Sequence, residues 1–92
     1  MAEVKKKACS GTMESSDAYV EIEPAVGGVT VELQSVVQAQ FGDAIEAAVR
    51  DVLRQQGVEQ AAVKVLDRGA LECVLRARVE TALLRSMEDE TV

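Results

Sequence analysis

The lack of histidine limits the catalytic chemistry that this sequence could support. The chain has 92 residues and no histidine, which excludes Ser-His and Cys-His pairs, histidine-bound zinc and imidazole acid–base catalysis. The remaining candidates are two thiols, Cys9 and Cys73, and two adjacent hydroxyls, Ser15 and Ser16. None of them has an activating base beside it in the sequence, so the serines cannot act as nucleophiles unaided.

The two serines lie in segment 11–17, which reads Gly-Thr-Met-Glu-Ser-Ser-Asp. Small and polar residues of this kind favour an exposed turn. A hydroxyl there cannot react unaided, but it is accessible to another enzyme that adds a group to it. From the spacing alone two interpretations stay open: solvated turn serines, or an attachment site for a covalent group.

Both cysteines are expected to be free thiols. Cys9 and Cys73 are far apart in a chain that shows no export signal, which disfavours a structural disulfide. Cys9 follows three lysines, residues 5–7, but it has neither a base nor a resolving cysteine nearby, so we interpret it as incidental. Cys73 falls in an apolar helical pattern and is expected in the core.

Charge is unevenly distributed along the chain. Ten basic and 16 acidic residues give a formal net charge of −6, which argues against nucleic acid as a partner. Glu14, Asp17, Glu21 and Glu23 lie in a region without Lys or Arg, and they lack the spacing of a calcium loop. We therefore expect no metal site but a solvated acidic face, which serves either solubility or a partner with a basic docking surface.

No segment predicts insertion into a membrane or export. The longest stretches without a charged residue, 33–42 and 24–31, are far shorter than the roughly 20 apolar residues of a spanning helix. No apolar run follows the lysines at the start of the chain. We expect a cytoplasmic protein.

Two segments alternate as half-buried strands do. Ala18, Val20 and Ile22 share one side of the first segment, which ends at Pro24, and residues 29–33 alternate again. Gly27 and Gly28 between them permit a tight turn, so the sequence predicts a hairpin.

The remaining chain predicts helix, strand and helix. Ser35 and Gln38 have capping-box spacing for a helix that reaches about Gln56, although a glycine at position 42 makes Asp43 an alternative start. Residues 62–67 form the expected third strand, and residues 70 to about 87 the second helix. On that helix Arg76 and Arg78 point about 200° apart, so only one can face a given partner.

These elements predict an α+β fold. The order strand-strand-helix-strand-helix packs two helices on one face of a small sheet, which gives a two-layer sandwich with an aliphatic core. Residues 18–92 are expected to be a single domain. Residues 1–17, which lack an apolar period, are expected to be a flexible N-terminal arm that ends in the serine-containing turn.

Read with the rest of the chain, segment 11–17 resembles the modification motif of the acyl carrier subunit (gamma chain) of bacterial citrate lyase, Gly-Thr-x-Glu-Ser-(Ser/Gly)-Asp. Three further segments look like signatures of that family, so that the resemblance covers about residues 8 to 86. They are Ile22-Glu23-Pro24, Gln40-Phe41-Gly42 and the run from Asp67 through Gly69-Ala70-Leu71-Glu72-Cys73 to Arg76-Ala77-Arg78.

The resemblance implies a role for Ser15. In that family the serine after the glutamate carries 2'-(5''-phosphoribosyl)-3'-dephospho-CoA through a phosphodiester, and the matching residue here is Ser15. Ser16 stands where many relatives have glycine. The resemblance further implies a non-catalytic carrier of acetyl and citryl thioesters. Its partners would be the alpha (transferase) and beta (lyase) subunits of citrate lyase and a prosthetic-group transferase, with no nucleic acid and no membrane.

Other functions remain open at this point. The carrier subunit of malonate decarboxylase bears a related group on a similar serine and shares the architecture. A small acidic interaction module without a covalent group would also fit the charge pattern. A thiol enzyme that uses Cys9 is the third alternative, and it lacks a base.

Overall fold

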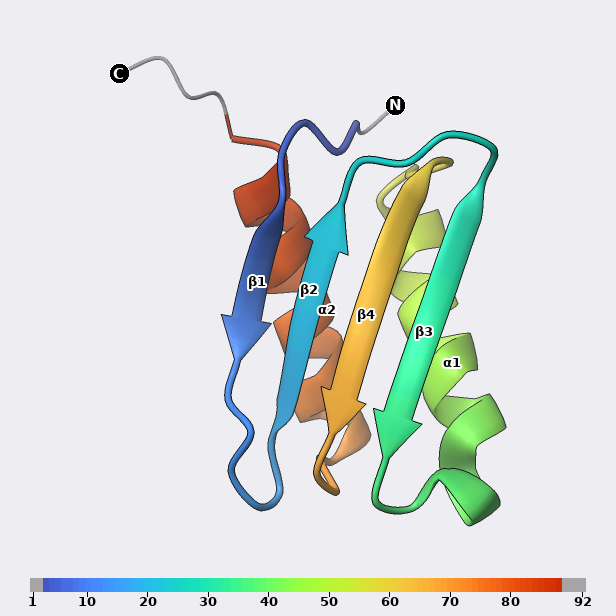
Figure 1. Cartoon of the computed structure of the whole chain (residues 1–92), viewed down its shortest axis with the longest axis vertical. Helices are drawn as coiled ribbons and strands as arrows, with labels where there is room; N and C mark the ends of the chain where they lie inside the picture. The colour runs from blue at the N-terminus through green and yellow to red at the C-terminus, as the bar shows by residue number, and fades with distance from the viewer. Residues whose placement is uncertain (1–2, 89–92) are drawn as a thin grey trace.

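The computed structural model describes residues 3–88 as a two-layer α+β sandwich (Figure 1). Four strands form one sheet, and both helices cover the same face of it. The expected fold class is confirmed. The elements in chain order are β1 (Ala8–Gly11), β2 (Ala18–Glu23), β3 (Val29–Ser35), α1 (Gln38–Gln55), β4 (Ala61–Asp67) and α2 (Glu72–Ser86).

The strand order is β1-β2-β4-β3, so the expected hairpin of β2 and β3 is wrong. β4 lies between these two strands, antiparallel to β2 and parallel to β3. The parallel pair is joined by α1, which crosses over the sheet as a parallel connection requires. A central strand of this kind is bounded by partners on both sides, and β4 buries Ala61, Val63, Val65 and Asp67.

β1 lies within the residues expected to form an arm. It pairs antiparallel with β2, with Ala8 opposite Ile22 and Ser10 opposite Val20. Before it, the backbone amides of Lys5 and Lys6 both donate to the Ser86 carbonyl at the end of α2, at 2.9 and 3.1 Å. The structure therefore adds a strand to the expected order, and most of the predicted arm belongs to the sandwich.

The core is aliphatic, as expected. β2 contributes Ala18, Val20 and Ile22, and each helix buries one stripe against the sheet. The α1 stripe is Ala48, Val49, Val52 and Leu53, and the α2 stripe is Leu75, Val79, Ala82, Leu83 and Ser86. Cys73 lies outside the α2 stripe and is exposed, so its predicted core position is wrong.

α1 begins at Gln38 and includes Gly42, so the alternative start at Asp43 is wrong. The Gln38 side chain accepts a hydrogen bond from the Ser35 amide at 3.3 Å, but the N-cap is Val37 and it makes no side-chain cap, so the capping box expected at Ser35 is wrong. No helix within residues 3–88 is long and apolar enough to cross a bilayer.

Candidate functional site

The serine turn, residues 12–17, connects β1 to β2 at one end of the sandwich (Figure 1). Ser15 and Ser16 are both exposed on it. Gly11 enters the turn with φ of +96°, and a Cβ at this position would lie 1.9 Å from the Ala18 carbonyl oxygen. Only glycine allows the chain to turn back so close to β2.

Asp17 connects the turn to α2. Arg78 donates to both of its carboxylate oxygens, Nε to Oδ1 and Nη2 to Oδ2, each at 2.9 Å. The Thr12 hydroxyl donates to Oδ2 at 2.7 Å, and the Ala18 amide donates to Oδ1 at 2.7 Å. We call this set of contacts the Asp17 clamp.

The clamp buries most of the Asp17 side chain and lowers the pKa of its carboxyl. Its side chain is only 14% exposed, so the expected solvated acid is wrong for this residue. The hydrogen bond from Arg78, followed by that from Thr12, holds the pKa of the carboxyl well below its usual range. A bidentate arginine–carboxylate pair also fixes geometry, so the clamp orients the turn as well as neutralising its charge.

A second set of contacts joins the turn to the loop after β4. The Ser16 amide donates to the Arg68 carbonyl, and the Arg68 amide donates to the Asp17 carbonyl, both at 2.9 Å. Within the turn, the Asp17 amide donates to the Glu14 carbonyl at 3.2 Å. The turn is thus exposed but held on two sides.

The loop after β4 is itself fixed by Asp67, which is buried. The Ser35 hydroxyl donates to Asp67 Oδ2 at 2.7 Å, and the Ala70 amide donates to Oδ1 at 3.0 Å. Both carboxylate oxygens are therefore engaged. Asp67 therefore fixes the loop after β4, which contacts the serine turn, and does not act as a base for the serines.

The two serines differ in their surroundings. The Ser15 side chain is exposed and makes no hydrogen bond within residues 3–88. Ser16 has φ of +66°, a left-handed conformation that favours glycine, and its amide is held by Arg68. Ser15 is thus an accessible hydroxyl with no base beside it, which can accept a group but cannot activate itself.

Cys9 lies beside Tyr19 and Glu21 on the sheet. It is exposed and pairs with Glu21 on the face of the sheet away from the helices. The interaction with Cys9, together with burial and the nearby Glu21 charge, raises the pKa of Tyr19 to about 12. A neutral phenol at physiological pH cannot serve as the general base that a thiol enzyme would need.

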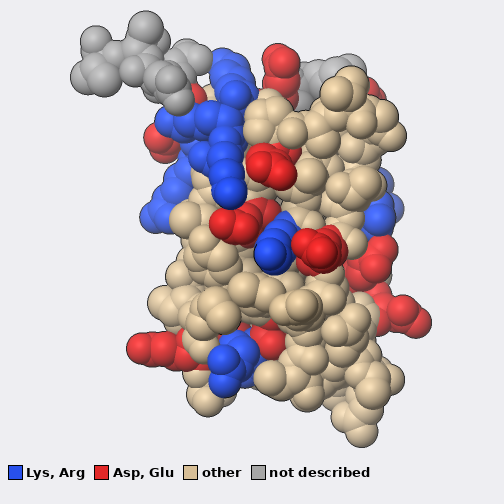
Figure 2. Space-filling view, viewed as in Figure 1, with Lys and Arg blue, Asp and Glu red and all other residues tan. Residues whose placement is uncertain are grey.

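The open face of the sheet carries charges of both signs (Figure 2). Lys64 on β4 lies opposite Glu21 on β2 and Glu32 on β3. Lys7 Nζ lies 3.8 Å from Glu21 Oε1. The predicted acidic face is therefore mixed in this region, because Lys64 of β4 and Lys7 of the segment before β1 lie beside Glu21 of β2.

Arg76 and Arg78 face different partners, as their spacing predicts. Arg76 binds Asp51 on α1 at 2.8 Å and Glu72 at 2.9 Å, while Arg78 binds Asp17. The sequence did not identify Asp17 as the partner of Arg78, which lies 61 residues away. The only local signal was the 200° separation of the two arginines.

Replacing Arg78 with alanine should release the serine turn. Without the guanidinium, Asp17 loses two of its charge-assisted hydrogen bonds. Exchange of the Ser16 and Arg68 amide protons should accelerate by on the order of tenfold, as local opening becomes easier. Arg76→Ala is the matched control, since its contacts lie between α1 and α2. Unchanged exchange in Arg78→Ala would contradict the clamp.

The clamp should also make stability depend on pH. The folded pKa of Asp17 lies below its ordinary value of 3.8, so the stabilisation is complete above that value and is lost as pH falls through the folded pKa. The stability difference between the natural chain and Asp17→Asn should therefore shrink from about pH 5 to about pH 2. Urea unfolding measures it, with Glu14→Gln as an exposed control. A difference that grows on acidification would exclude this role.

Comparison with known proteins gives matches over nearly the whole chain. A family model named ACP and described as malonate decarboxylase delta subunit (MdcD) matches residues 5–86. The citrate lyase acyl carrier protein of Klebsiella pneumoniae is 55% identical over 87 residues, 94% of this chain and 90% of the relative. Citrate lyase acyl carrier protein 2 of Salmonella typhi is 51% identical over 88 residues, 95% of this chain and 91% of the relative.

A solved structure has the same fold. It is the crystal structure of a Pseudomonas malonate decarboxylase hetero-tetramer in complex with malonate. One of its chains superposes with a TM-score of 0.78 at 21% identity, covering 91% of this chain and 87% of that chain. At this identity the likeness concerns architecture alone.

Proposed function

This chain belongs to the citrate lyase acyl carrier protein family, and from that premise we propose that Ser15 carries its prosthetic group. The attached group would be phosphoribosyl dephospho-coenzyme A, joined to the Ser15 oxygen through a phosphodiester. On it the protein would present acetyl and citryl thioesters while citrate is cleaved to acetate and oxaloacetate.

One observation carries the proposal: Ser15 presents a free, exposed hydroxyl on a turn held from both sides. Access by a modifying enzyme requires exposure, and a fixed turn presents the same hydroxyl geometry to that enzyme each time. The absence of a base beside Ser15 within residues 3–88 agrees with an acceptor whose chemistry is supplied by another protein.

The residues around Ser15 suit an anionic linkage. Arg68 follows β4, its backbone contacts the turn, and its exposed side chain makes no hydrogen bond or ion pair within the described residues. The Asp17 carboxylate, which would repel a phosphodiester, is already paired with Arg78. When bound, the group supplies a thiol that holds acyl groups as thioesters.

The partners of such a carrier would be three enzymes. A prosthetic-group transferase would load Ser15, the alpha subunit would exchange acetyl for citryl, and the beta subunit would cleave the citryl thioester. Holding the thioester on a tether raises its effective concentration at each neighbouring pocket. The domain itself orients the tether and needs no catalytic residue.

Intact mass after co-expression with the citrate lyase modifying enzymes tests the proposal. The expected result is a gain equal to the complete group. Cleavage after glutamates releases peptide 15–21, whose fragmentation assigns the group to Ser15 or Ser16. An unmodified mass from a host that makes active citrate lyase would refute the proposal.

A carrier role in malonate decarboxylase is the second candidate, favoured by the matching family model and by the shared architecture. Reconstitution separates the two. The loaded protein should support citrate cleavage with citrate lyase subunits and should not support malonate decarboxylation with the corresponding malonate decarboxylase subunits. The reverse pattern would assign it to malonate decarboxylase.

A further inference from the structure

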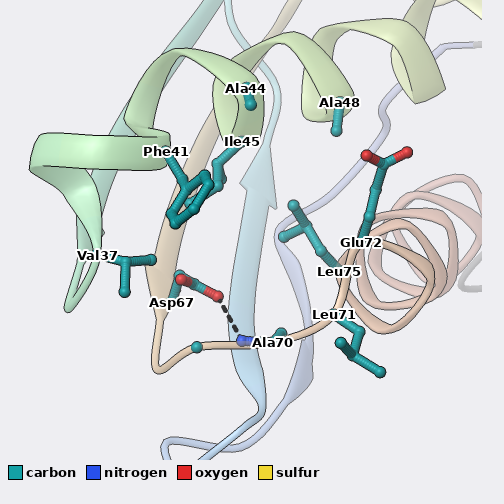
Figure 3. Close-up of a pocket in the computed structure, with 11 residues that line it drawn as sticks. Val37, Phe41, Ala44, Ile45, Ala48, Asp67, Ala70, Leu71, Glu72 and Leu75 are labelled. Atoms are coloured by element: carbon teal, nitrogen blue, oxygen red, sulfur yellow. Dashed lines mark hydrogen bonds between the residues drawn. The ribbon is translucent and has the colours of Figure 1, made fainter.

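An apolar cleft of about 340 Å³ opens at the same end of the molecule as the serine turn. Its walls come from the first turns of α1, the loop after β4 and the start of α2 (Figure 3). Phe41 and Ile45 of α1 face Leu75 across it, whereas Leu71 lies at its rim and points away from them. This volume lies in the range of pockets that hold small molecules.

The cleft is nearly free of unpaired charge. Asp67 lies in its wall with both carboxylate oxygens hydrogen-bonded, to Ser35 and to the Ala70 amide. Glu72 accepts a hydrogen bond from Arg76 at 2.9 Å. The cleft therefore favours an uncharged, apolar occupant, because burying an unpaired anion there would be costly.

The cleft leaves large apolar side chains in contact with water. Phe41, one of only two aromatic residues in the chain, is 52% exposed, and Leu71 is 71% exposed. An exposed phenyl ring at the wall of a cleft suits a planar partner that stacks on it.

Arg68 connects the cleft to the serine turn. Its backbone exchanges hydrogen bonds with Ser16 and Asp17, and the next residues, Gly69 to Leu71, line the cleft. The exposed Arg68 guanidinium, which has no partner within residues 3–88, thus belongs to the short segment between the attachment point and the apolar walls.

We infer that the cleft binds the adenine base of the group carried on Ser15, while Arg68 faces its phosphates. The inference rests on the function proposed above. Adenine is uncharged, planar and apolar on both faces, as the cleft requires, and its ribose is linked to the phosphoribosyl unit that Ser15 holds. The thiol end stays free for the partner enzymes.

Methyl and aromatic NMR of the apo and loaded proteins tests this inference, after intact mass has verified loading. Loading should shift the methyl signals of Ile45, Leu71 and Leu75 and produce NOEs between adenine protons and the Phe41 ring. The Leu84 methyls, exposed on α2 outside the cleft, serve as the internal reference. A loaded protein with unchanged cleft signals would overturn the inference alone, whereas failure to load would overturn both proposals.

Leu71→Glu and Leu84→Glu form a matched pair, since both leucines are exposed. In loaded Leu71→Glu the adenine NOEs and the cleft shifts should be lost, while loaded Leu84→Glu should retain them. Phe41→Ala gives the same readout if Leu71→Glu disturbs the apo spectrum.

Two other occupants of the cleft would overturn the inference. Cleft signals that move only when a citrate lyase subunit is added would show that an apolar segment of a partner binds there. Dilution-dependent shifts of the apo protein would indicate that a second copy of this chain binds there.

Discussion

Ser15→Ala is expected to remove carrier function completely. The variant should gain no mass when co-expressed with the modifying enzymes, and a citrate lyase complex reconstituted with it should cleave citrate only through added free thioester. A tether commonly supplies an advantage of about 10²–10⁴ over an untethered ligand. The expected loss of rate at low free thioester is therefore of that order, measured as oxaloacetate formation.

Ser16→Ala is the control for this experiment, because it removes a hydroxyl from the same turn. It should load on the same residue as the natural chain. Since Ser16 adopts a positive φ, Ser16→Gly should load equally well and relieve the backbone. Normal loading of Ser15→Ala combined with failure of Ser16→Ala would move the attachment to Ser16.

Gly11→Ala is expected to give the largest loss of stability among single substitutions near the turn. The added Cβ would lie 1.9 Å from the Ala18 carbonyl oxygen and 3.1 Å from Cδ of Arg78. Left-handed strain of roughly 1–2 kcal/mol then adds to the displacement of β1 from β2. We expect a loss of about 3 kcal/mol or more in the free energy of unfolding, measured by urea titration.

Gly27→Ala separates the two causes of that loss. Gly27 has φ of +92°, close to that of Gly11, but a Cβ there would meet nothing within 4 Å. Its cost should be limited to the backbone strain of roughly 1–2 kcal/mol. Equal losses at the two positions would show that the close approach of Gly11 to β2 is unimportant.

The sequence predicts each long element because local periodicity reports which side of it is buried. β2, β4 and both helices carry their apolar residues at the right spacing and were correctly predicted. Strand pairing is not local. The two glycines after β2 fit a hairpin turn. In the structure, however, β4 lies between β2 and β3, because α1 carries the chain back across the sheet so that β4 pairs parallel with β3.

The same reasoning does not predict the short strand β1 or which residues of α2 are buried. β1 has four residues, and its burial comes from contact with β2 and α2 rather than from an apolar period of its own. Cys73 fits the α2 pattern in sequence, but the helix turns Leu75 and Val79 to the sheet instead. Half a turn of helix rotation decides which residue is buried, and packing sets that rotation.

The serine turn is predicted from its motif, whereas the contacts that hold it could not be predicted from the sequence. Asp17 appears in the sequence as one of several acids, and only the fold brings Arg78 and the Arg68 backbone to it. Within residues 3–88 the Ser15 hydroxyl makes no hydrogen bond to a side chain that could act as a base. The sequence thus indicates which hydroxyl is available, and the tertiary contacts explain why it is presented in one way.

The contacts that hold the serine turn limit the distance over which such a carrier can deliver its acyl group. Because the turn is fixed to α2 and to the end of β4, a group attached to Ser15 would start from one position on the domain. The thiol can then reach only points inside a sphere centred near Ser15, whose radius is the length of the extended group. The catalytic pockets of a working assembly must either lie together within that sphere or be reached by rotation of the whole sandwich.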